Sequence, residues 1–156
     1  MQIDIPFPET DIRKAAAADG ITHISTGIAV VQDNKILMVR RAPGDYLAGV
    51  FELPGGGVDE GESILDGALR ELVEETGLRA RRILGTFDGF DYSTDKKPHV
   101  RQINFIVQAE PVDVKLNPDE HDAYLWVDTE VLQRIETTDK MRDCVADALT
   151  RIGKTD

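Results

Sequence analysis

Cysteine and long apolar runs are scarce in this sequence. Cys144 is the only cysteine among 156 residues, which excludes an internal disulfide and is typical of proteins in a reducing compartment. No apolar run is long enough to cross a membrane, and the first residues, MQIDIPFPET, lack the basic and apolar regions of a signal peptide. We therefore expect a cytoplasmic protein with no membrane partner.

Positive charge is also scarce. Lys and Arg number 18 against 29 Asp and Glu, so the formal net charge is −11. This charge argues against long nucleic acids as partners, because they call for a basic stripe on the protein. Small anionic substrates remain compatible, because bound metal ions supply positive charge locally. The length suits one domain with its own core.

Several nucleotide and metal motifs are missing. There is no Walker loop, no HExxH and no paired CxxC, and the run GGGVDEG does not fit the dinucleotide-binding pattern GxGxxG. The chain has instead a segment from Gly56 to Leu78 that reads GGVDEGESILDGALRELVEETGL. Ser63 can cap a helix in this segment and Gly77 can end it in a left-handed conformation, so we predict a helix over residues 63–76.

One face of this predicted helix is acidic. Glu71, Glu74 and Glu75 share it, because spacings of three and four residues stack on a helix. Packing alone would not select three carboxylates that repel each other, whereas Mg²⁺ prefers oxygen ligands and resolves the repulsion. Arg70 flanks this face and can orient one carboxylate. A second face is mostly apolar and should pack on a core: Leu65, Leu69, Leu72, Val73 and Thr76.

The whole segment resembles the Nudix box, the signature of enzymes that hydrolyse a nucleoside diphosphate linked to another group. Every fixed position of that pattern is filled, from Gly56 through Glu62 and Arg70 to Leu78. The resemblance implies a metal-dependent hydrolase of the cytoplasm that binds Mg²⁺, with Mn²⁺ able to replace it. The implied metal ligands are three carboxylates and one backbone carbonyl: Glu71, Glu74, Glu75, and Gly55 or Gly56.

The resemblance also implies a general base, for which the sequence offers two candidates. Many Nudix enzymes carry an acidic residue into the site from the loop before a late strand, as a ligand or as the base. Glu120 lies in such a loop, NPDEHDAY, although Asp119, His121 and Asp122 compete for that role. Glu71 is the other candidate, so the base is left open between Glu71 and Glu120.

Five further residues are candidates for contacts with the substrate. Arg40 and Arg41 follow a predicted strand and can clamp a phosphate, although a solvated role is the alternative. Tyr46, Phe90 and Tyr92 lie in or near loops and can stack on a base, with core or rim packing as the alternative. The substrate is a small nucleotide whose leaving group the sequence does not specify. It can be a nucleoside triphosphate, a nucleotide sugar, ADP-ribose or a dinucleoside polyphosphate.

The pattern of apolar residues predicts an α/β fold. We expect strands at residues 22–32, 35–41, 51–53, 82–92, 100–108 and 124–127, and helices at 129–135 and 139–152 around the helix of the box. The Nudix resemblance implies an α/β/α sandwich with a central mixed β-sheet. We expect this domain over residues 21–156, preceded by an N-terminal extension of residues 1–20 that adds a helical turn at 15–18.

Two other classes of protein remain open. A nucleotide-sensing module on the same fold binds without turnover, but such modules usually lose box glutamates, and this chain has kept them all. A diphosphate isomerase on the same fold uses a catalytic cysteine, whereas Cys144 lies in a C-terminal helical pattern and is expected to be a buried small side chain. The sequence leaves a homodimer open.

Overall fold

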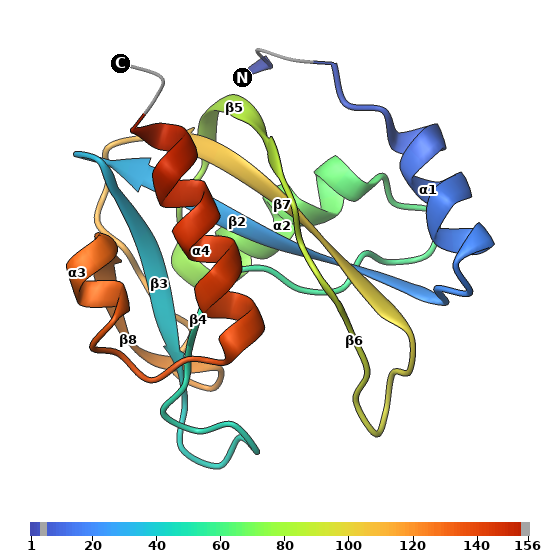
Figure 1. Ribbon diagram of the computed structural model, residues 1–156. Coiled ribbons are helices and arrows are strands. Elements are labelled where there is room, and N and C mark those ends of the chain that lie inside the picture. The colour runs from blue at the N-terminus through green and yellow to red at the C-terminus, as the bar shows by residue number, and fades with distance from the viewer. Residues whose placement is uncertain (4–5, 154–156) are drawn as a thin grey trace.

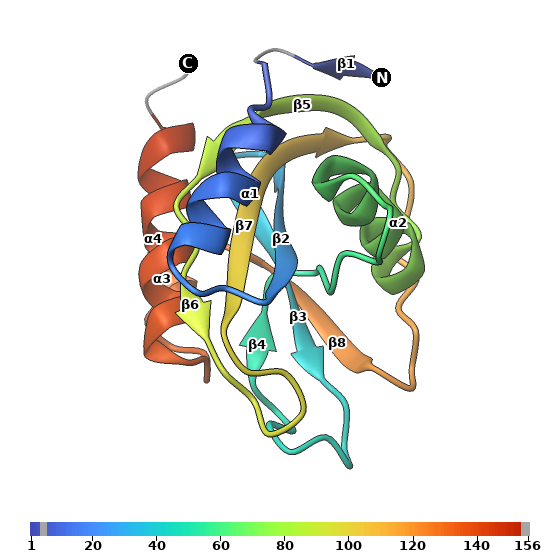
Figure 2. The same ribbon diagram turned by 90° about the vertical axis from the view of Figure 1, so that its right-hand side faces the viewer.

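A computed structural model describes residues 1–3 and 6–153. An eight-stranded sheet lies between two layers of helices, with α2 on one face and α4 on the other (Figures 1 and 2). The predicted α/β sandwich is thereby confirmed. The strands are β1 (Gln2–Ile3), β2 (His23–Gln32), β3 (Lys35–Arg41), β4 (Phe51–Glu52), β5 (Ala80–Phe87), β6 (Asp91–Tyr92), β7 (Val100–Ala109) and β8 (His121–Val127). The helices are α1 (Glu9–Ala18), α2 (Ile64–Thr76), α3 (Thr129–Leu132) and α4 (Asp139–Ile152).

The sheet is mixed and opens at one place. Its order is β1-β5-β7-β2-β3-β4, with β6 on β7 and β8 on β3, and only β1–β5 and β2–β7 are parallel. β2 and β3 pair only beside their hairpin turn. Beyond that turn the glycine segment takes the edge of β2, where Thr26 N donates to Gly56 O at 2.9 Å and Ile28 N donates to Pro54 O at 2.8 Å. The strands therefore diverge next to the Gly55–Gly57 loop.

Two apolar clusters cover the two faces of the sheet. The period of two along β2 divides its residues between them, because successive side chains point to opposite faces. Ile28 and Val30 pack with α2, and Ala29 packs with α4. Phe7 joins the cluster beneath α2, where its ring centroid lies 5.0 Å from that of Phe105. Apolar side chains thus cover both faces of the sheet. This packing holds β2 and β3 in place where they diverge beside the glycine loop.

The helix of the box has the predicted caps. Ser63 Oγ accepts a hydrogen bond from Asp66 N at 3.0 Å, and Gly77 is left-handed with φ 72°. Its buried face agrees with the prediction in part, because Leu72 and Thr76 are buried whereas Leu65, Leu69 and Val73 are only half-buried. The buried residues include a glutamate: Ile64, Gly67, Ala68, Leu72, Glu75 and Thr76. The helix therefore turns part of its acidic face into the molecule.

Other element bounds differ from the sequence predictions. The predicted strand 82–92 is interrupted after Phe87, at a point where a Cβ on Gly89 would lie 1.8 Å from the Gln102 carbonyl oxygen. β8 begins at His121 rather than at residue 124, and the helix predicted at 129–135 ends at Leu132. Trp126 of β8 is half-buried. Within the described ranges, no helix combines the length and the apolar character needed to cross a membrane.

The N-terminal extension is more structured than the predicted turn. α1 runs for 10 residues, and its Glu9 Oε1 accepts a hydrogen bond from Ile64 N at 2.7 Å. Arg13 Nη2 donates to Glu62 O at 3.0 Å. Both contacts fall at the start of α2, where unsatisfied N–H groups favour a carboxylate. The division into residues 1–20 and 21–156 stays a prediction.

Candidate active site

A polar cleft of about 350 Å³ lies where β2 and β3 diverge. The glycine loop forms its floor, α2 forms one wall, and the starts of β4 and β8 approach from the other side. Five carboxylates but only one arginine line it. The lining residues are Ser25, Thr26, Arg41, Asp45, Glu52, Leu53, Gly55, Gly56, Glu71, Glu75, Tyr92, Gln102, Glu120, His121 and Met141.

Glu75 is the most deeply placed of these carboxylates, with 5% of the residue exposed. Its Oε2 accepts a hydrogen bond from Gly55 N at 3.1 Å. Burial raises the pKa of Glu75 to about 9, since it disfavours the charged form more than this hydrogen bond stabilises it. The neighbouring charges of Glu52, Glu71 and Glu120 raise it further. Without a cation, Glu75 is therefore protonated at neutral pH.

Glu71 lies one helical turn before Glu75 and faces the same cleft. Gly56 packs directly against it, because a Cβ at Gly56 would lie 2.5 Å from Glu71 Cδ. Burial raises the pKa of Glu71, while its hydrogen bond from Arg70 acts in the opposite direction. The glycine is thus required by the close approach of this carboxylate to the loop.

Arg70 lies behind the cleft and joins the loop to the helix. Its Nε and Nη2 donate to the two oxygens of Glu62 at 2.8 and 3.0 Å, and Nη2 also donates to Gly57 O at 3.0 Å. Its Nη1 donates to Glu71 Oε1 at 3.1 Å and to Glu74 Oε2 at 3.2 Å. Hydrogen bonds from Arg70 lower the pKa of Glu62 to about 2. Arg70 therefore orients Glu71 from the side away from the cleft.

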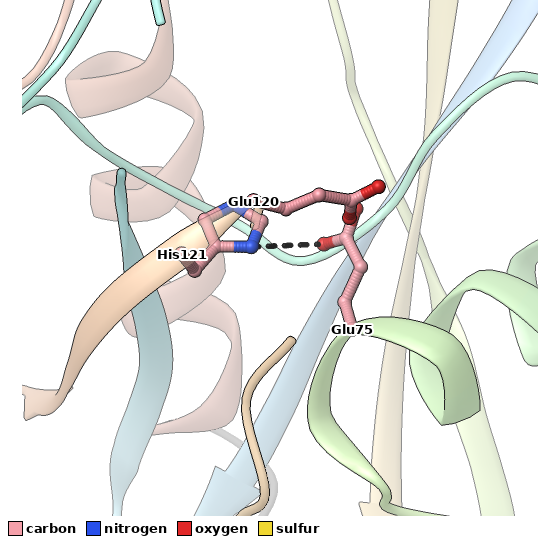
Figure 3. Close-up of side chains that lie close together, drawn as sticks. All are labelled: Glu75, Glu120 and His121. Carbon is pink, nitrogen blue, oxygen red and sulfur yellow. Dashed lines mark ion pairs between the residues drawn. The ribbon is translucent and has the colours of Figure 1, made fainter. Parts of the chain in front are cut away.

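Glu120 and His121 reach the cleft from the start of β8 and meet Glu75 from the end of α2 (Figure 3). One ligand atom from each of the three residues lies within 4.8 Å of the others. Glu120 is exposed, and nothing in the part of the chain that the structure describes donates a hydrogen bond to its carboxylate. Its carboxylate is therefore free to take a ligand or a proton.

His121 is buried, with 3% of the residue exposed. Its Nε2 lies 2.8 Å from Glu52 Oε2, while its Nδ1 lies 3.9 Å from Glu75 Oε2 and has no hydrogen-bond partner among the described residues. A hydrogen bond from Nε2–H to Glu52 leaves the Nδ1 lone pair directed toward Glu75. The cleft thus contains a buried acceptor that no described group satisfies.

Arg41 is the only guanidinium in the cleft lining, and two carboxylates already hold it. Its Nη1 donates to Glu52 Oε1 at 2.8 Å and its Nη2 donates to Asp45 Oδ2 at 2.7 Å. The Tyr46 ring centroid lies 5.4 Å from the guanidinium carbon. Although burial opposes the shift, these two carboxylates raise the pKa of Arg41. Arg41 therefore offsets local negative charge rather than standing free for a phosphate.

The structure brings most of the predicted site residues to the cleft but not all. Arg40 is directed away from it and pairs with Asp122 at 2.8 Å, because adjacent residues of β3 point to opposite faces. Phe90 lies 5.9 Å from Tyr92, ring centroid to centroid, without lining the cleft, and 75% of Tyr46 is exposed. The side chain of Glu74 is 56% exposed and contacts Arg70 instead.

The two glycines proposed as metal ligands differ in whether their carbonyl oxygens already accept hydrogen bonds. The Gly56 carbonyl accepts hydrogen bonds from Thr26 N at 2.9 Å and from Thr26 Oγ1 at 3.2 Å. The Gly55 carbonyl accepts none within the described ranges. Since a carbonyl oxygen has two lone pairs, Gly56 is already satisfied, and Gly55 is the better candidate.

Sequence reasoning missed Glu52, which contacts both Arg41 and His121. One signal could have found it, because Glu52 is the only charged residue between Asp45 and Asp59. A lone carboxylate in a short apolar strand that enters the glycine loop indicates a specific partner, since buried charges are usually paired.

The residues of the cleft fit a hard divalent cation. Glu71, Glu75 and Glu120 supply carboxylate oxygens and Gly55 a free carbonyl, which are the ligand types that Mg²⁺ and Mn²⁺ prefer. The single arginine of the lining is paired with Asp45 and Glu52, and the nearest basic side chain to Glu75 is His121, whose Nδ1 lies 3.9 Å from Glu75 Oε2. A cation at this point would remove the cost of burying like charges together.

Comparison with known proteins places the chain in a family. The model of the NUDIX domain matches residues 21–148. The chain therefore belongs to the Nudix hydrolase family, and the resemblance of the Gly56–Leu78 segment is confirmed.

Individual relatives are similar over most of the chain. An ADP-ribose pyrophosphatase of Methanocaldococcus jannaschii is 34% identical, with 72% of this chain and 61% of the relative covered. The m7GpppN-mRNA hydrolase NUDT17 of Danio rerio is 30% identical over 85% of this chain and 52% of its own length. An RNA pyrophosphohydrolase of Pelagibacter ubique is 31% identical over 67% of this chain and 75% of its own length. The chain thus spans only about half to two thirds of the first two relatives.

The solved structures agree with the fold. The crystal structure of a MutT protein from Methanosarcina mazei Go1 superposes with a TM-score of 0.72 at 29% identity, covering 85% of this chain and 96% of that chain. A MutT NUDIX hydrolase from Burkholderia pseudomallei gives 0.67 at 26% identity, covering 80% and 95%.

Proposed function

We propose that this chain hydrolyses the diphosphate bond of a small nucleoside diphosphate derivative in the cytoplasm, with Mg²⁺ as cofactor and Mn²⁺ able to replace it. One observation carries the proposal. Three carboxylates, Glu71, Glu75 and Glu120, converge on one cleft whose only cation is already paired. A site of this charge repels a diphosphate unless divalent cations are bound with it.

Glu71, Glu75 and the Gly55 carbonyl would hold the metal, and Glu120 would lie beside it. Bound there, divalent cations would offset the charge of the diphosphate and lower the pKa of an attacking water. Glu74, the fourth predicted ligand, contacts Arg70 in this structure and would have to leave it to join the site. Arg70 keeps Glu71 directed at the cleft by pairing with Glu62 on its other side.

Of the two candidate bases, we favour Glu120. Its carboxylate receives no hydrogen bond from the described residues, so both of its oxygens are open to a water molecule. One oxygen of Glu71 already accepts a hydrogen bond from Arg70. A carboxylate that takes a proton from water must lie within hydrogen-bond reach of it, and Glu120 projects into the space beside Glu75 (Figure 3).

The names of the relatives support cleavage of a diphosphate bond but do not agree on one substrate. Two of them are named for pyrophosphate chemistry, on ADP-ribose and on RNA. The net charge of −11 favours the small nucleotide for this chain. Cys144, which an isomerase would need as a catalyst, lies on α4 outside the cleft lining, and burial raises the pKa of its thiol to about 12.

The test is product release from a substrate panel. Nucleoside triphosphates, nucleotide sugars, ADP-ribose and dinucleoside polyphosphates are each incubated with the full chain and Mg²⁺, and the products are resolved by chromatography. We expect cleavage at a diphosphate bond of at least one substrate class, and none with Glu75→Gln. Binding of a nucleotide by calorimetry without any cleavage would instead identify a sensing module and overturn the proposal.

A further inference from the structure

A second pocket, of about 540 Å³, adjoins the cleft. Ser25 and Tyr92 line both spaces, and Gly57, which follows the floor of the cleft, lines the second. α1 forms its outer wall, and Figure 2 shows this helix in front of β7 and β2. At this boundary Tyr92 Oη donates a hydrogen bond to Ser25 Oγ at 3.1 Å, so a group attached to a diphosphate in the cleft would pass beside this pair to reach the pocket.

Six aliphatic side chains line one part of the second pocket, and polar or charged side chains line the rest. The aliphatic part suits a flat, uncharged ring, because ligand pockets combine apolar walls with a few placed polar groups. From α1, the small side chains of Ala16 and Ala17 face this space, together with the longer Arg13. The aliphatic lining residues are Ala16, Ala17, Ile21, Ile24, Val58 and Val100.

Lys97 stands at the boundary between the pocket and the cleft. Its Nζ lies 3.2 Å from the position that a Cβ on Gly57 would take. No carboxylate of the described chain forms an ion pair with it, although the protein carries a net charge of −11. The Lys97 ammonium group thus lies beside the glycine loop without a carboxylate partner. It is placed to contact a substrate phosphate that extends from the cleft toward the pocket.

The helix that forms the wall is fixed to the catalytic elements. Glu9 and Arg13 contact the start of α2, and Asp19 at the other end of α1 accepts a hydrogen bond from Arg101 of β7 at 2.9 Å. Contacts at both ends hold the helix at a defined distance from the loop. Residues of the N-terminal extension therefore belong to the substrate-binding surface rather than to a separate segment.

We propose that this second pocket binds the nucleoside of the substrate, with the base among the aliphatic side chains and Lys97 on the adjoining phosphate. Asp59 and Glu60 also line it, and these carboxylates favour ribose hydroxyls over a further phosphate group. The inference rests on the proposed function, because the diphosphate in the cleft sets which way the nucleoside extends.

Two variants test the pocket, each with a matched control. Ala17→Phe fills the space, and Ala15→Phe places the same side chain at an exposed position of α1 outside the lining. Lys97→Met removes the charge, Lys97→Arg keeps it, and Lys96→Met removes a neighbouring charge that does not line the pocket. The five variants alter four exposed positions that lie outside the apolar clusters, and circular dichroism checks their folding.

The first readout is binding of AMP, GMP, CMP and UMP by calorimetry, which needs no turnover. We expect Ala17→Phe and Lys97→Met to raise the dissociation constant of the monophosphate that binds best by about tenfold, or about 1.4 kcal/mol. The two controls and Lys97→Arg should stay near the wild type. Unchanged affinity in both test variants, or no binding of any monophosphate, would overturn the inference.

The second readout separates this inference from the proposed function. With a nucleotide that the wild type cleaves, both test variants should raise KM about tenfold and leave kcat nearly unchanged, because the reacting groups lie in the cleft. Hydrolysis with an unaltered KM would reject the pocket and leave the proposed function standing. Monophosphate binding without hydrolysis of any substrate would reject the proposed function and leave the pocket standing.

Discussion

His121 Nε2 and Glu52 Oε2 lie 2.8 Å apart at the back of the cleft, and this contact fixes which ring nitrogen faces Glu75. The same Glu52 carboxylate holds Arg41 through its other oxygen at 2.8 Å. Glu52 thus links the one cation of the lining to the buried imidazole. It forms no hydrogen bond with Glu71 or Glu120, so it acts on the site through these two partners and through its charge, which raises the pKa of Glu75.

We expect Glu52→Gln to lower kcat or metal affinity by about tenfold, the effect typical of residues that orient groups around a metal. The amide keeps the shape but no longer selects the tautomer of His121 or neutralises Arg41. Steady-state rates and a Mn²⁺ titration followed by electron paramagnetic resonance measure the change. Glu130→Gln, at an exposed position of α3 outside both pockets, is the control, and equal behaviour of the two variants would show that the Glu52 contacts are only structural.

The neighbouring glycines 55 and 56 should respond differently to alanine. A Cβ at Gly56 meets only the end of the Glu71 side chain, so Gly56→Ala should fold while it displaces that carboxylate. A displacement of this size lowers kcat by about 100-fold. A Cβ at Gly55, where φ is 155°, would lie 2.0 Å from the Thr26 carbonyl oxygen, so Gly55→Ala should lose at least about 1 kcal/mol of stability.

Rates and urea unfolding of the two glycine variants check this contrast. A Gly56→Ala protein with wild-type kcat would show that the position of Glu71 is unimportant for the rate. A Gly55→Ala protein as stable as the wild type would contradict the close packing of the loop on β2.

We expect Glu120→Gln to lower kcat by about 100-fold or more, as loss of a general base does. The acidic limb of the pH–rate profile should disappear, and metal affinity should change little. Asp119→Asn is the matched control, because its carboxylate neighbours Glu120 without lining the cleft. If metal affinity falls instead, Glu120 is a ligand, and if neither quantity changes, Glu71 becomes the leading candidate for the base.

The stability of the metal-free protein should fall as pH rises. Burial raises the pKa of Glu75 from 4.5 to about 9, so the folded state keeps a proton that the unfolded state releases. The contribution of Glu75 is therefore fully present below pH 4.5 and is lost as pH rises to about 9. Urea unfolding in EDTA across this range measures it, and Glu75→Gln should flatten the dependence. An equally steep slope in that variant would assign the effect to other groups.

The sequence was sufficient for those features that depend on local spacing. Ser63, Gly77 and the stacking of Glu71 on Glu75 follow from helix geometry, and the hairpin at Asp33 and Asn34 follows from a turn between two apolar runs. Both turn residues adopt positive φ, as Asp and Asn tolerate better than most.

Features that depend on contacts between distant segments were not predictable. Glu52 and His121 are 69 residues apart in sequence, and nothing local indicates that they meet. The orientation of α2 that buries Glu75 depends on the hydrogen bond that Gly55 N of the glycine loop donates to the Glu75 carboxylate. The full length of α1 depends on its contacts with the start of α2. The different directions of Arg40 and Arg41 were not predictable either, because the phase of β3 relative to the cleft is set by its pairing with β8.

The most direct test of the proposed function is the initial rate of diphosphate hydrolysis against Mg²⁺ concentration, for metal-stripped wild type and Glu75→Gln. The account predicts no wild-type hydrolysis without metal, recovery on addition of Mg²⁺, and a rate at saturating Mg²⁺ at least about 100-fold lower in the variant. Full activity of the metal-free wild type, or a wild-type rate in the variant, would contradict the assignment of this cleft.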